Sequence, residues 1–370
     1  MTLHPAHTMP FDALLAGLKA ALAERLVYER PGPDGLALYV YTERCVYEAA
    51  WDVFTISARG LILDIAARRI VATPFPKFFN AGERDGAVPD LPFETTEKLD
   101  GSLIIIFHHS GKWRAATKGA FASTQALWAQ ARLDARDLSA LVPGVTYLAE
   151  ATYPENKIIV FYPEASLRML AAYGADGVEL EAQALAATGF PPVKRLAFDS
   201  VAEMLAKAKG LPRSEEGYVV RFADGLRLKI KGDEYRRIHA LISGLTPLNI
   251  WRLMSAGDDL EKVRRDLPEE FWADFDALTS ILRGEVAKVI ATVASAAQEH
   301  AGLSDKELGL KLSTLDEVPR QFIFSFRKSG GDLLQGRTRE QVFRAIRPDG
   351  NVLAGYKASS AMNRIVEEDG

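Results

Sequence analysis

The stretch Glu97-Lys98-Leu99-Asp100-Gly101-Ser102 runs directly into the apolar segment Leu103 to Phe107. An Asp-Gly pair is typical of a tight turn, and an unbroken apolar run of this length is typical of a buried strand. A lysine just before the turn would point its amine from a rigid element into whatever pocket the turn borders. The simpler alternative is a hairpin turn with a solvated lysine, because short motifs often arise by chance.

Strand-like runs flank this stretch on both sides, separated by Gly, Pro, Asp and Asn. Helical spacing of apolar residues predicts helices near residues 11–22, 124–138 and 200–209. Because strands and helices do not alternate regularly, we expect an α+β domain built on antiparallel sheets over residues 1–245. The predicted strands are Leu61 to Ile65, Ser102 to Phe107, Val145 to Glu150, Lys157 to Tyr162, Gly217 to Phe222 and Leu226 to Ile230.

The pattern changes after about residue 245. Apolar residues recur every three or four positions from Phe271 to Val293, which predicts one long amphipathic helix with Pro268 near its start. Phe322 to Phe326 is the one later stretch with strand character. We expect a smaller, all-helical domain over residues 246–370.

The composition narrows the class of protein. The chain has 370 residues, 48% hydrophobic and 25% charged, so it can form a folded core. A net charge of −4 argues against binding to nucleic acid through bulk positive charge. Cys45 is the only cysteine, which excludes an internal disulfide and a cysteine zinc cluster. Neither a membrane-spanning apolar run nor a signal-peptide pattern occurs, and we expect a cytoplasmic protein with no membrane partner.

Charged residues in other segments could complete a pocket around Lys98. An amine attacks a phosphorus atom only when it is deprotonated, and burial beside other cations favours the uncharged form. The same cations would neutralise phosphate oxygens in the transition state, and Glu216 would be the ligand of Mg²⁺, with Mn²⁺ as the alternative ion. The set fits a covalent nucleotidyltransferase and consists of Arg59, Lys77, Lys118, Glu150, Glu216, Lys229 and Lys231.

The ordered segments ARG, PKFFN, EKLDGS, TKG, AEATYPENKIIVFY, EEGYVV and LKIK resemble the phage-type single-strand RNA ligases. That family belongs to the superfamily of RNA ligases, DNA ligases and capping enzymes. The resemblance covers about residues 57 to 235, and PKFFN with Tyr153 to Val160 favours the RNA ligase branch. It implies an adenylyltransferase (nucleotidyltransferase) domain, and the helical tail fits the same branch.

The resemblance also implies a role for each matching residue. Lys98 would be the nucleophile that bonds to AMP, and Lys229 and Lys231 would grip the α-phosphate during attack and transfer. Glu150 would meet the ribose hydroxyls and Glu216 would hold the metal. The other implied contacts are Arg59 and Lys77 with the triphosphate, Lys118 with another phosphate oxygen, and Glu97 and Ile230 with the adenine. Two alternatives stay open: an ion pair between Glu150 and Arg59, and a surface position for Lys77.

The function implied is that of an ATP-dependent RNA ligase. It would join RNA ends that carry a 5′-phosphate and a 3′-hydroxyl, in RNA repair such as that of cleaved tRNA. Its partners would be RNA, ATP and Mg²⁺, and we expect a monomer. The alternatives are a DNA ligase, a capping-type guanylyltransferase and a non-catalytic module that binds RNA ends.

A cationic segment in the tail is a second candidate for contact with RNA. Within residues 320 to 347, seven cationic side chains oppose Asp332 and Glu340, a local net charge of 7 − 2 = +5. Such a surface could follow an RNA backbone, with Phe322, Phe324 or Phe326 stacking on bases. The alternative is a solvated helix face with packed phenylalanines. The cations are Arg320, Arg327, Lys328, Arg337, Arg339, Arg344 and Arg347.

Overall fold

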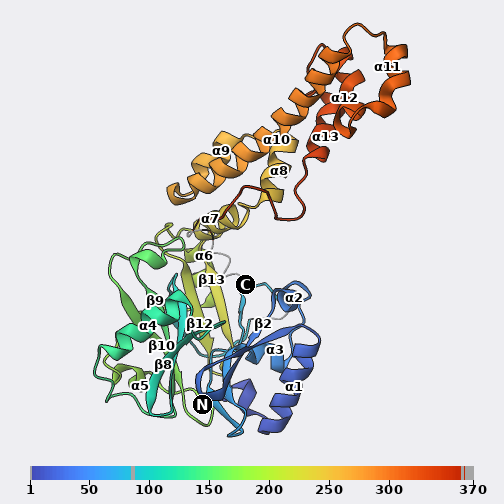
Figure 1. Cartoon of the computed structure of the whole chain (residues 1–370). Helices are drawn as coiled ribbons and strands as arrows, with labels where there is room; N and C mark the ends of the chain where they lie inside the picture. Colours follow the sequence, from blue (N-terminus) through green and yellow to red (C-terminus); the bar gives the residue numbers. More distant parts are fainter. Residues whose placement is uncertain (1, 85–87, 360–361, 363–370) are drawn as a thin grey trace. The chain divides into compact units, whose positions relative to one another are not determined.

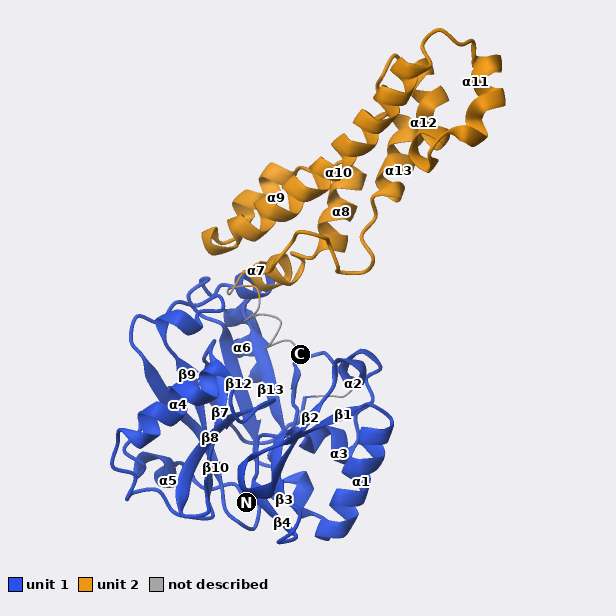
Figure 2. Ribbon diagram, in the orientation of Figure 1, with its two compact units in different colours: residues 1–237, 367–370 blue, residues 238–366 orange. Residues whose placement is uncertain are grey.

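The computed structural model describes residues 2–84, 88–359 and 362 (Figure 1). The chain forms two compact units, of which the first ends at Arg237 and the second begins at Ile238 (Figure 2). The domain boundary predicted at residue 245 lies in the second unit. The division into domains of residues 1–245 and 246–370 stays a prediction.

The first unit contains all the strands that carry the predicted site residues. Its helices are α1 (Phe11–Ala23), α2 (Glu43–Tyr47), α3 (Val53–Ser57), α4 (Thr124–Asp134), α5 (Ala182–Ala186) and α6 (Val201–Ala208). Its strands are β1 (Val27–Pro31), β2 (Leu36–Tyr41), β3 (Arg59–Asp64), β4 (Arg69–Ala72), β5 (Phe79–Asn80), β6 (Phe93–Lys98), β7 (Ser102–His109), β8 (Lys112–Thr117), β9 (Thr146–Thr152), β10 (Ser166–Tyr173), β11 (Arg195–Leu196), β12 (Gly217–Phe222) and β13 (Arg227–Lys231).

These strands form three sheets, with the orders β1-β2-β3-β4, β10-β9-β7-β8 and β11-β6-β12-β13-β5. Neighbouring strands are antiparallel except β13 and β5, which are parallel. The predicted α+β class with antiparallel sheets is confirmed. The parallel pair was not foreseen, because β5 contains only Phe79 and Asn80 and is too short to show a strand pattern.

The unbroken apolar run after the lysine motif is explained by burial on both faces of β7. Ile104 and Ile106 pack with Ala129 and Leu133 of α4, whereas Ile105 and Phe107 face the sheet of β1 to β4. Side chains alternate between the faces of a strand, so a strand covered on both sides needs apolar residues at every position. This packing fixes the strand that follows Lys98 and its turn.

One predicted strand is wrong. Residues 158–160 form bends, and none of residues 157–162 lies in a strand. The reason lies in the backbone hydrogen bonds: the N–H groups of Ile159 and Val160 donate to the carboxylate of Asp100, at 2.8 Å and 2.7 Å. A backbone that donates to a side chain cannot donate to a neighbouring strand at the same positions.

The second unit is helical, as predicted. Its helices are α7 (Asp233–Ser243, which begins in the first unit), α8 (Pro247–Ala256), α9 (Leu260–Asp266), α10 (Trp272–Glu299), α11 (Asp305–Lys311), α12 (Glu317–Lys328) and α13 (Gly336–Ala345). The long amphipathic helix is α10, and its buried stripe includes Phe275, Leu282 and Val293. The strand character of Phe322 to Phe326 was misleading, because these residues lie in α12 with Phe322 fully buried. None of the helices in the described part of the chain is long and apolar enough to cross a bilayer.

The entry to β12 depends on a glycine. Gly217 has φ +147°, and a Cβ atom there would lie 2.0 Å from the carbonyl oxygen of Ile230. An added methyl group would therefore clash with the backbone of the neighbouring strand. Gly217 directly follows Glu216, so this close approach also sets where the Glu216 carboxylate lies.

We predict that Gly217→Ala lowers the free energy of unfolding of the first unit by at least about 2 kcal/mol. The matched control is Gly284→Ala in α10, where an added Cβ meets nothing within 4 Å. The control should gain about 0.5–1 kcal/mol from helix propensity. Because the glycines lie in different units, hydrogen exchange of β12 and of α10 reads each effect locally. Equal protection of β12 in Gly217→Ala and the native chain would contradict the prediction.

Candidate active site

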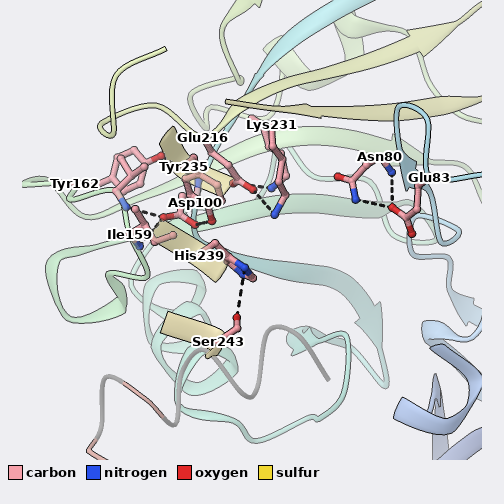
Figure 3. A network of polar contacts seen from close by, with 12 residues as sticks. Asn80, Glu83, Asp100, Ile159, Tyr162, Glu216, Lys231, Tyr235, His239 and Ser243 are labelled. Atoms are coloured by element: carbon pink, nitrogen blue, oxygen red, sulfur yellow. Dashed lines mark hydrogen bonds and ion pairs between the residues drawn. The ribbon is translucent and has the colours of Figure 1, made fainter. Parts of the chain in front are cut away.

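Three adjacent strands bring Lys98, Glu216 and Lys231 together. Gly217, the first residue of β12, pairs with Lys98 on one side and with Lys231 on the other, so Glu216 directly precedes β12 between two lysines. The Lys98 Nζ lies 2.7 Å from Glu216 Oε2, and the Lys231 Nζ lies 3.2 Å from Glu216 Oε1. Figure 3 shows Glu216 and Lys231 pointing toward one another. Each carboxylate oxygen therefore has its own ammonium partner.

This cluster is largely removed from water. The side chain of Glu216 is 2% exposed and that of Lys98 is 18% exposed. Burial alone would raise the pKa of Glu216, but the ammonium groups of Lys98 and Lys231 outweigh it and lower that pKa. The sequence led us to expect cations that favour the uncharged amine of Lys98. The structure adds a carboxylate in direct contact, which favours the charged amine.

The lysine with a strongly lowered pKa is Lys229. Burial, reinforced by the positive charges of Arg59, Lys98 and Lys77, lowers its pKa well below the usual value. Lys229 lies two residues before Lys231 and so shares its face of β13. The predicted concentration of positive charge is present in the structure, and its largest effect falls on Lys229.

Arg59 lies at the start of β3 and carries an unused donor. Its Nη1 atom is buried and has no hydrogen-bond partner among the described residues. The guanidinium carbon lies 5.5 Å from the centre of the Phe78 ring, and the Lys229 Nζ lies 4.9 Å from the same centre. A buried donor without a partner is costly, so this position is suited to an anionic ligand.

Lys77 is partly buried and lies among aromatic rings. Its Nζ lies 5.3 Å from the ring centres of Tyr41 and Trp51 and 5.5 Å from that of Phe79. The sequence indicated only the phenylalanine neighbours, because Tyr41 and Trp51 come from distant segments. Lys118 approaches from β8, since its Cα would be 3.0 Å from a Cβ added at Gly60.

Glu150, in β9, is a carboxyl group whose charge is suppressed. Burial raises its pKa to about 7, although Lys98 nearby acts in the opposite direction. No ion pair joins Glu150 to Arg59 in the part of the chain that the structure describes, so that alternative is not supported. Near neutral pH Glu150 is part protonated and can both donate and accept a hydrogen bond.

A cavity of about 120 Å³ joins several of these residues. Its walls include Lys98, Glu150 and Lys229, with Glu97 on the same rim and an apolar surface from Phe78, Leu170 and Val219. Sequence reasoning missed these apolar residues, because nothing distinguishes them from core residues. A larger cavity of about 530 Å³ adjoins Lys77 and Phe78, but none of the paired lysines and acids lines it.

Glu97 and Ile230 differ in where they lie. The Glu97 carboxylate accepts a hydrogen bond from the backbone N–H of Lys194 at 3.0 Å, beside the cavity. Ile230 packs with Tyr218 and Met204 on the other face of β13. An adenine contact by the Ile230 side chain is therefore not supported.

Asp100 is a residue whose role the sequence did not reveal. It is 1% exposed, and its Oδ1 accepts a hydrogen bond from the Tyr235 hydroxyl at 2.7 Å (Figure 3). Burial, helped by the charge of Glu216, raises its pKa. Tyr235 also places its ring 5.0 Å from the Lys231 Nζ. The only sequence signal for Tyr235 is its position four residues after Lys231, on the first turn of α7.

Several cations of the tail have structural partners. The Arg327 guanidinium donates to the backbone carbonyls of Leu303 and His300, at 3.0 Å and 2.6 Å. Arg339 donates to the carbonyls of Met254 and Ser255 at the end of α8. These two side chains hold helices together, so the cationic surface is smaller than the sequence suggested. Contact of the tail with RNA stays a prediction.

The convergence of one lysine, further cations and buried acids between two sheets defines a class of site suited to covalent nucleotidyl transfer. A model of the RNA ligase family matches residues 57–235, just under half of the chain. This match confirms the resemblance to RNA ligases seen in the sequence over residues 57–235.

A curated relative has similar sequence. The putative bifunctional polynucleotide kinase/RNA ligase of Autographa californica nuclear polyhedrosis virus is 30% identical over 260 residues, which cover 62% of this chain and 36% of that protein. The chain thus spans little more than a third of the length of this relative.

Solved structures of nucleic-acid ligases are also similar to the chain. An archaeal ATP-dependent RNA ligase is 16% identical with a TM-score of 0.48, covering 97% of this chain and 98% of that chain. A putative ATP-dependent DNA ligase from Aquifex aeolicus is 16% identical with a TM-score of 0.44, covering 70% and 69%.

We predict that Glu150 makes stability depend on pH. Folding raises the pKa of this carboxyl group from its usual 4.5 to about 7. The group therefore does not lower the free energy of unfolding below pH 4.5, and it lowers that free energy by the full amount above pH 7. Glu150→Gln removes the charge and should exceed the native chain in unfolding free energy by up to about 3 kcal/mol at pH 8. Near pH 4 the two should differ little. Denaturant titrations at both pH values measure this.

The control for this experiment is Glu24→Gln, which changes an exposed carboxylate on the same unit. It should leave the pH dependence of unfolding as it is in the native chain. A Glu150→Gln curve parallel to the native curve from pH 4 to pH 8 would contradict the assigned shift.

Proposed function

We propose that this chain is an ATP-dependent RNA ligase that joins a 5′-phosphate RNA end to a 3′-hydroxyl end through an AMP group bonded to Lys98. The observation that carries the proposal is the buried contact of Lys98 with Glu216, beside Lys231 and within the field of Lys229 and Arg59. The match of residues 57–235 to the RNA ligase family supports the reaction class.

In the first step, the Lys98 Nζ attacks the α-phosphorus of ATP. A nitrogen–phosphorus bond forms, the bond from the α-phosphorus to the bridging oxygen breaks, and pyrophosphate leaves. The amine must first lose its proton to solvent and leave the ion pair with Glu216. Displacement of Lys98 from Glu216 is therefore part of activation. Arg59 and Lys229 would neutralise charge that develops on the phosphate oxygens.

In the next two steps, AMP moves to the RNA and is then released. An oxygen of the RNA 5′-phosphate attacks the phosphorus bonded to Lys98, which frees the amine. The 3′-hydroxyl of the second end then attacks the RNA 5′-phosphate and displaces AMP, while the hydroxyl proton goes to solvent. Each step exchanges one phosphate linkage for another, so little free energy is lost as long as water is excluded.

The cavity residues suit the remainder of the nucleotide. Glu150 is positioned for ribose hydroxyls, because a part-protonated carboxyl group can pair with hydroxyls in either direction. Glu97, Leu170 and Val219 form the wall expected for a base. We assign Lys77 and Lys118 to the phosphates, as the sequence suggested.

The acidic residues fit a magnesium ion held mainly by substrate phosphates. No group of three or more ligand side chains that could hold a metal by itself occurs within the described residues. Glu216, once released by Lys98, is the carboxylate available, and Mg²⁺ commonly uses one or two carboxylates with phosphate oxygens. When bound, the ion would neutralise phosphate charge; Mn²⁺ is the alternative.

A role in RNA repair is consistent with the viral relative. Its name combines a polynucleotide kinase with an RNA ligase. A polynucleotide kinase supplies 5′-phosphate ends, which are the ends that the proposed reaction consumes. Repair of cleaved tRNA, a cytoplasmic location and a monomeric state stay predictions from the sequence.

Incubation with ATP and Mg²⁺ should add one AMP to the intact protein, read by mass spectrometry. Lys98→Ala should show no added mass, because it lacks the nucleophile. The matched control Lys112→Ala changes an exposed lysine of β8 and should be adenylated like the native chain. GTP in place of ATP, and DNA ends in place of RNA ends, separate the capping and DNA ligase alternatives. An AMP adduct that persists in Lys98→Ala would exclude Lys98 as nucleophile.

Lys98→Ala should also fail to join 5′-phosphorylated RNA but should still seal RNA that is supplied already adenylated. The last step needs no lysine–AMP bond, so the variant loses only the first two. Gel analysis of both substrates measures this difference. Loss of both reactions in a folded Lys98→Ala variant would contradict this prediction. Sealing of RNA by the native chain would exclude the alternative of a non-catalytic module that only binds RNA ends.

The aromatic face of Phe78 should contribute to adenylation beyond apolar packing, because the ring faces both Arg59 and Lys229. We predict that Phe78→Leu slows adenylation of Lys98 roughly fivefold, since a cation–π contact contributes about 1 kcal/mol. The control is Phe121→Leu, a partly buried ring of the same core cluster. Both variants should lose similar stability, while only Phe78→Leu should slow the adenylation measured by rapid quench.

A further inference from the structure

Phe161 is an exposed aromatic ring at the end of an otherwise buried apolar run. Ile158, Ile159 and Val160 are 3%, 8% and 4% exposed, whereas Phe161 is 57% exposed. The change from buried to exposed occurs within one residue. Single exposed apolar side chains are common, so exposure alone assigns nothing.

The residues on both sides of Phe161 are tied to the lysine motif. On one side the Val160 N–H donates to the Asp100 carboxylate at 2.7 Å, and on the other the Asp100 N–H donates to the Tyr162 hydroxyl at 3.0 Å. Figure 3 shows Tyr162 and Ile159 gathered around Asp100, next to Glu216. Asp100 is two residues from Lys98. The Phe161 ring is thus held out from a segment fixed to the proposed nucleophile.

The electrostatic surroundings favour a polyanion as the occupant. Lys98, Lys231 and Lys229 come from the strands that meet at Asp100 and Glu216, and Arg59 adds an unpaired donor. A nucleotide whose phosphate is drawn to these cations still needs a contact for its base. Unpaired bases of single-stranded RNA commonly stack on exposed aromatic rings.

We propose that Phe161 is the stacking platform for the terminal nucleobase of the RNA end whose 5′-phosphate accepts AMP from Lys98. The inference rests on the proposed function and names how that site recognises its RNA. Stacking needs only the face of a base, so the site selects an unpaired end and not a sequence. Phe161 belongs to RNA binding and not to ATP binding.

The test compares Phe161→Ala with Leu127→Ala. Leu127 lies in α4 of the same unit and is also 57% exposed, so the two changes remove equally accessible apolar side chains. Each protein is first adenylated with ATP, and discharge of AMP is then followed at increasing concentrations of 5′-phosphorylated RNA. Phe161→Ala should need roughly tenfold more RNA for half-maximal discharge, with adenylation and the maximal rate nearly unchanged. Leu127→Ala should match the native chain.

An RNA whose 5′-terminal nucleotide lacks its base isolates the contact. The native chain and Phe161→Ala should bind this abasic RNA equally, because the base that stacks is gone. Phe161→Trp should restore discharge of ordinary RNA, and its added fluorescence should be quenched by that RNA but not by the abasic one. Leu127→Trp should show no quenching with either.

The outcomes separate this inference from the proposed function. The stacking platform is overturned if Phe161→Ala needs the same RNA concentration for half-maximal discharge as the native chain. It is also overturned if the tenfold difference persists with abasic RNA. In both cases, discharge of AMP by the native chain still upholds the proposed ligase function. Loss of adenylation in Phe161→Ala that Phe161→Trp does not restore shows a structural role and also overturns it. If the native chain itself forms no AMP adduct, the ligase proposal fails, and quenching of Phe161→Trp by RNA still decides the platform.

Discussion

The site depends on one buried carboxylate held between two ammonium groups. Glu216 is 2% exposed and contacts Lys98 and Lys231 through different oxygens. Removal of one partner from a buried ion pair leaves an uncompensated charge, which is far more costly than loss of an exposed pair. The arrangement therefore requires three strands in a fixed register. Gly217 supplies it, because its lack of a side chain lets β12 and β13 approach closely at that point.

The same carboxylate explains how several positive charges can lie close together. Among the described residues, neither Lys229 nor Arg59 has a carboxylate partner like Glu216, and both lie near the Phe78 ring. An aromatic face offsets part of their repulsion but does not replace a hydrogen-bond acceptor. Burial and the neighbouring positive charges lower the pKa of Lys229, and one buried donor of Arg59 has no partner among the described residues. An anionic group between them would satisfy the Arg59 donor and offset the positive charge around Lys229, as the proposed binding of phosphate requires.

Much of this could be predicted from the sequence, for identifiable reasons. Residues such as Lys98 and Glu216 stand beside strands with clear patterns, and strand alternation places Lys229 and Lys231 on one face. The contribution of Tyr41 and Trp51 to the surroundings of Lys77 could not be predicted, because contacts between distant segments leave no local pattern. The strand expected at residues 157–162 failed for a related reason. Its apolar pattern is real, but a distant carboxylate takes its backbone donors.

Asp100 shows how that failure and the chemistry are connected. A buried carboxyl group that accepts from two backbone N–H groups and from the Tyr235 hydroxyl joins the segment after β9, the lysine turn and α7. Had residues 157–162 formed a strand, their N–H groups would have been used in a sheet and Asp100 would have been a buried acid with too few donors. The irregular backbone is therefore what makes the Asp-Gly turn stable in the interior. It also leaves Phe161 exposed beside the segment that is tied to Asp100.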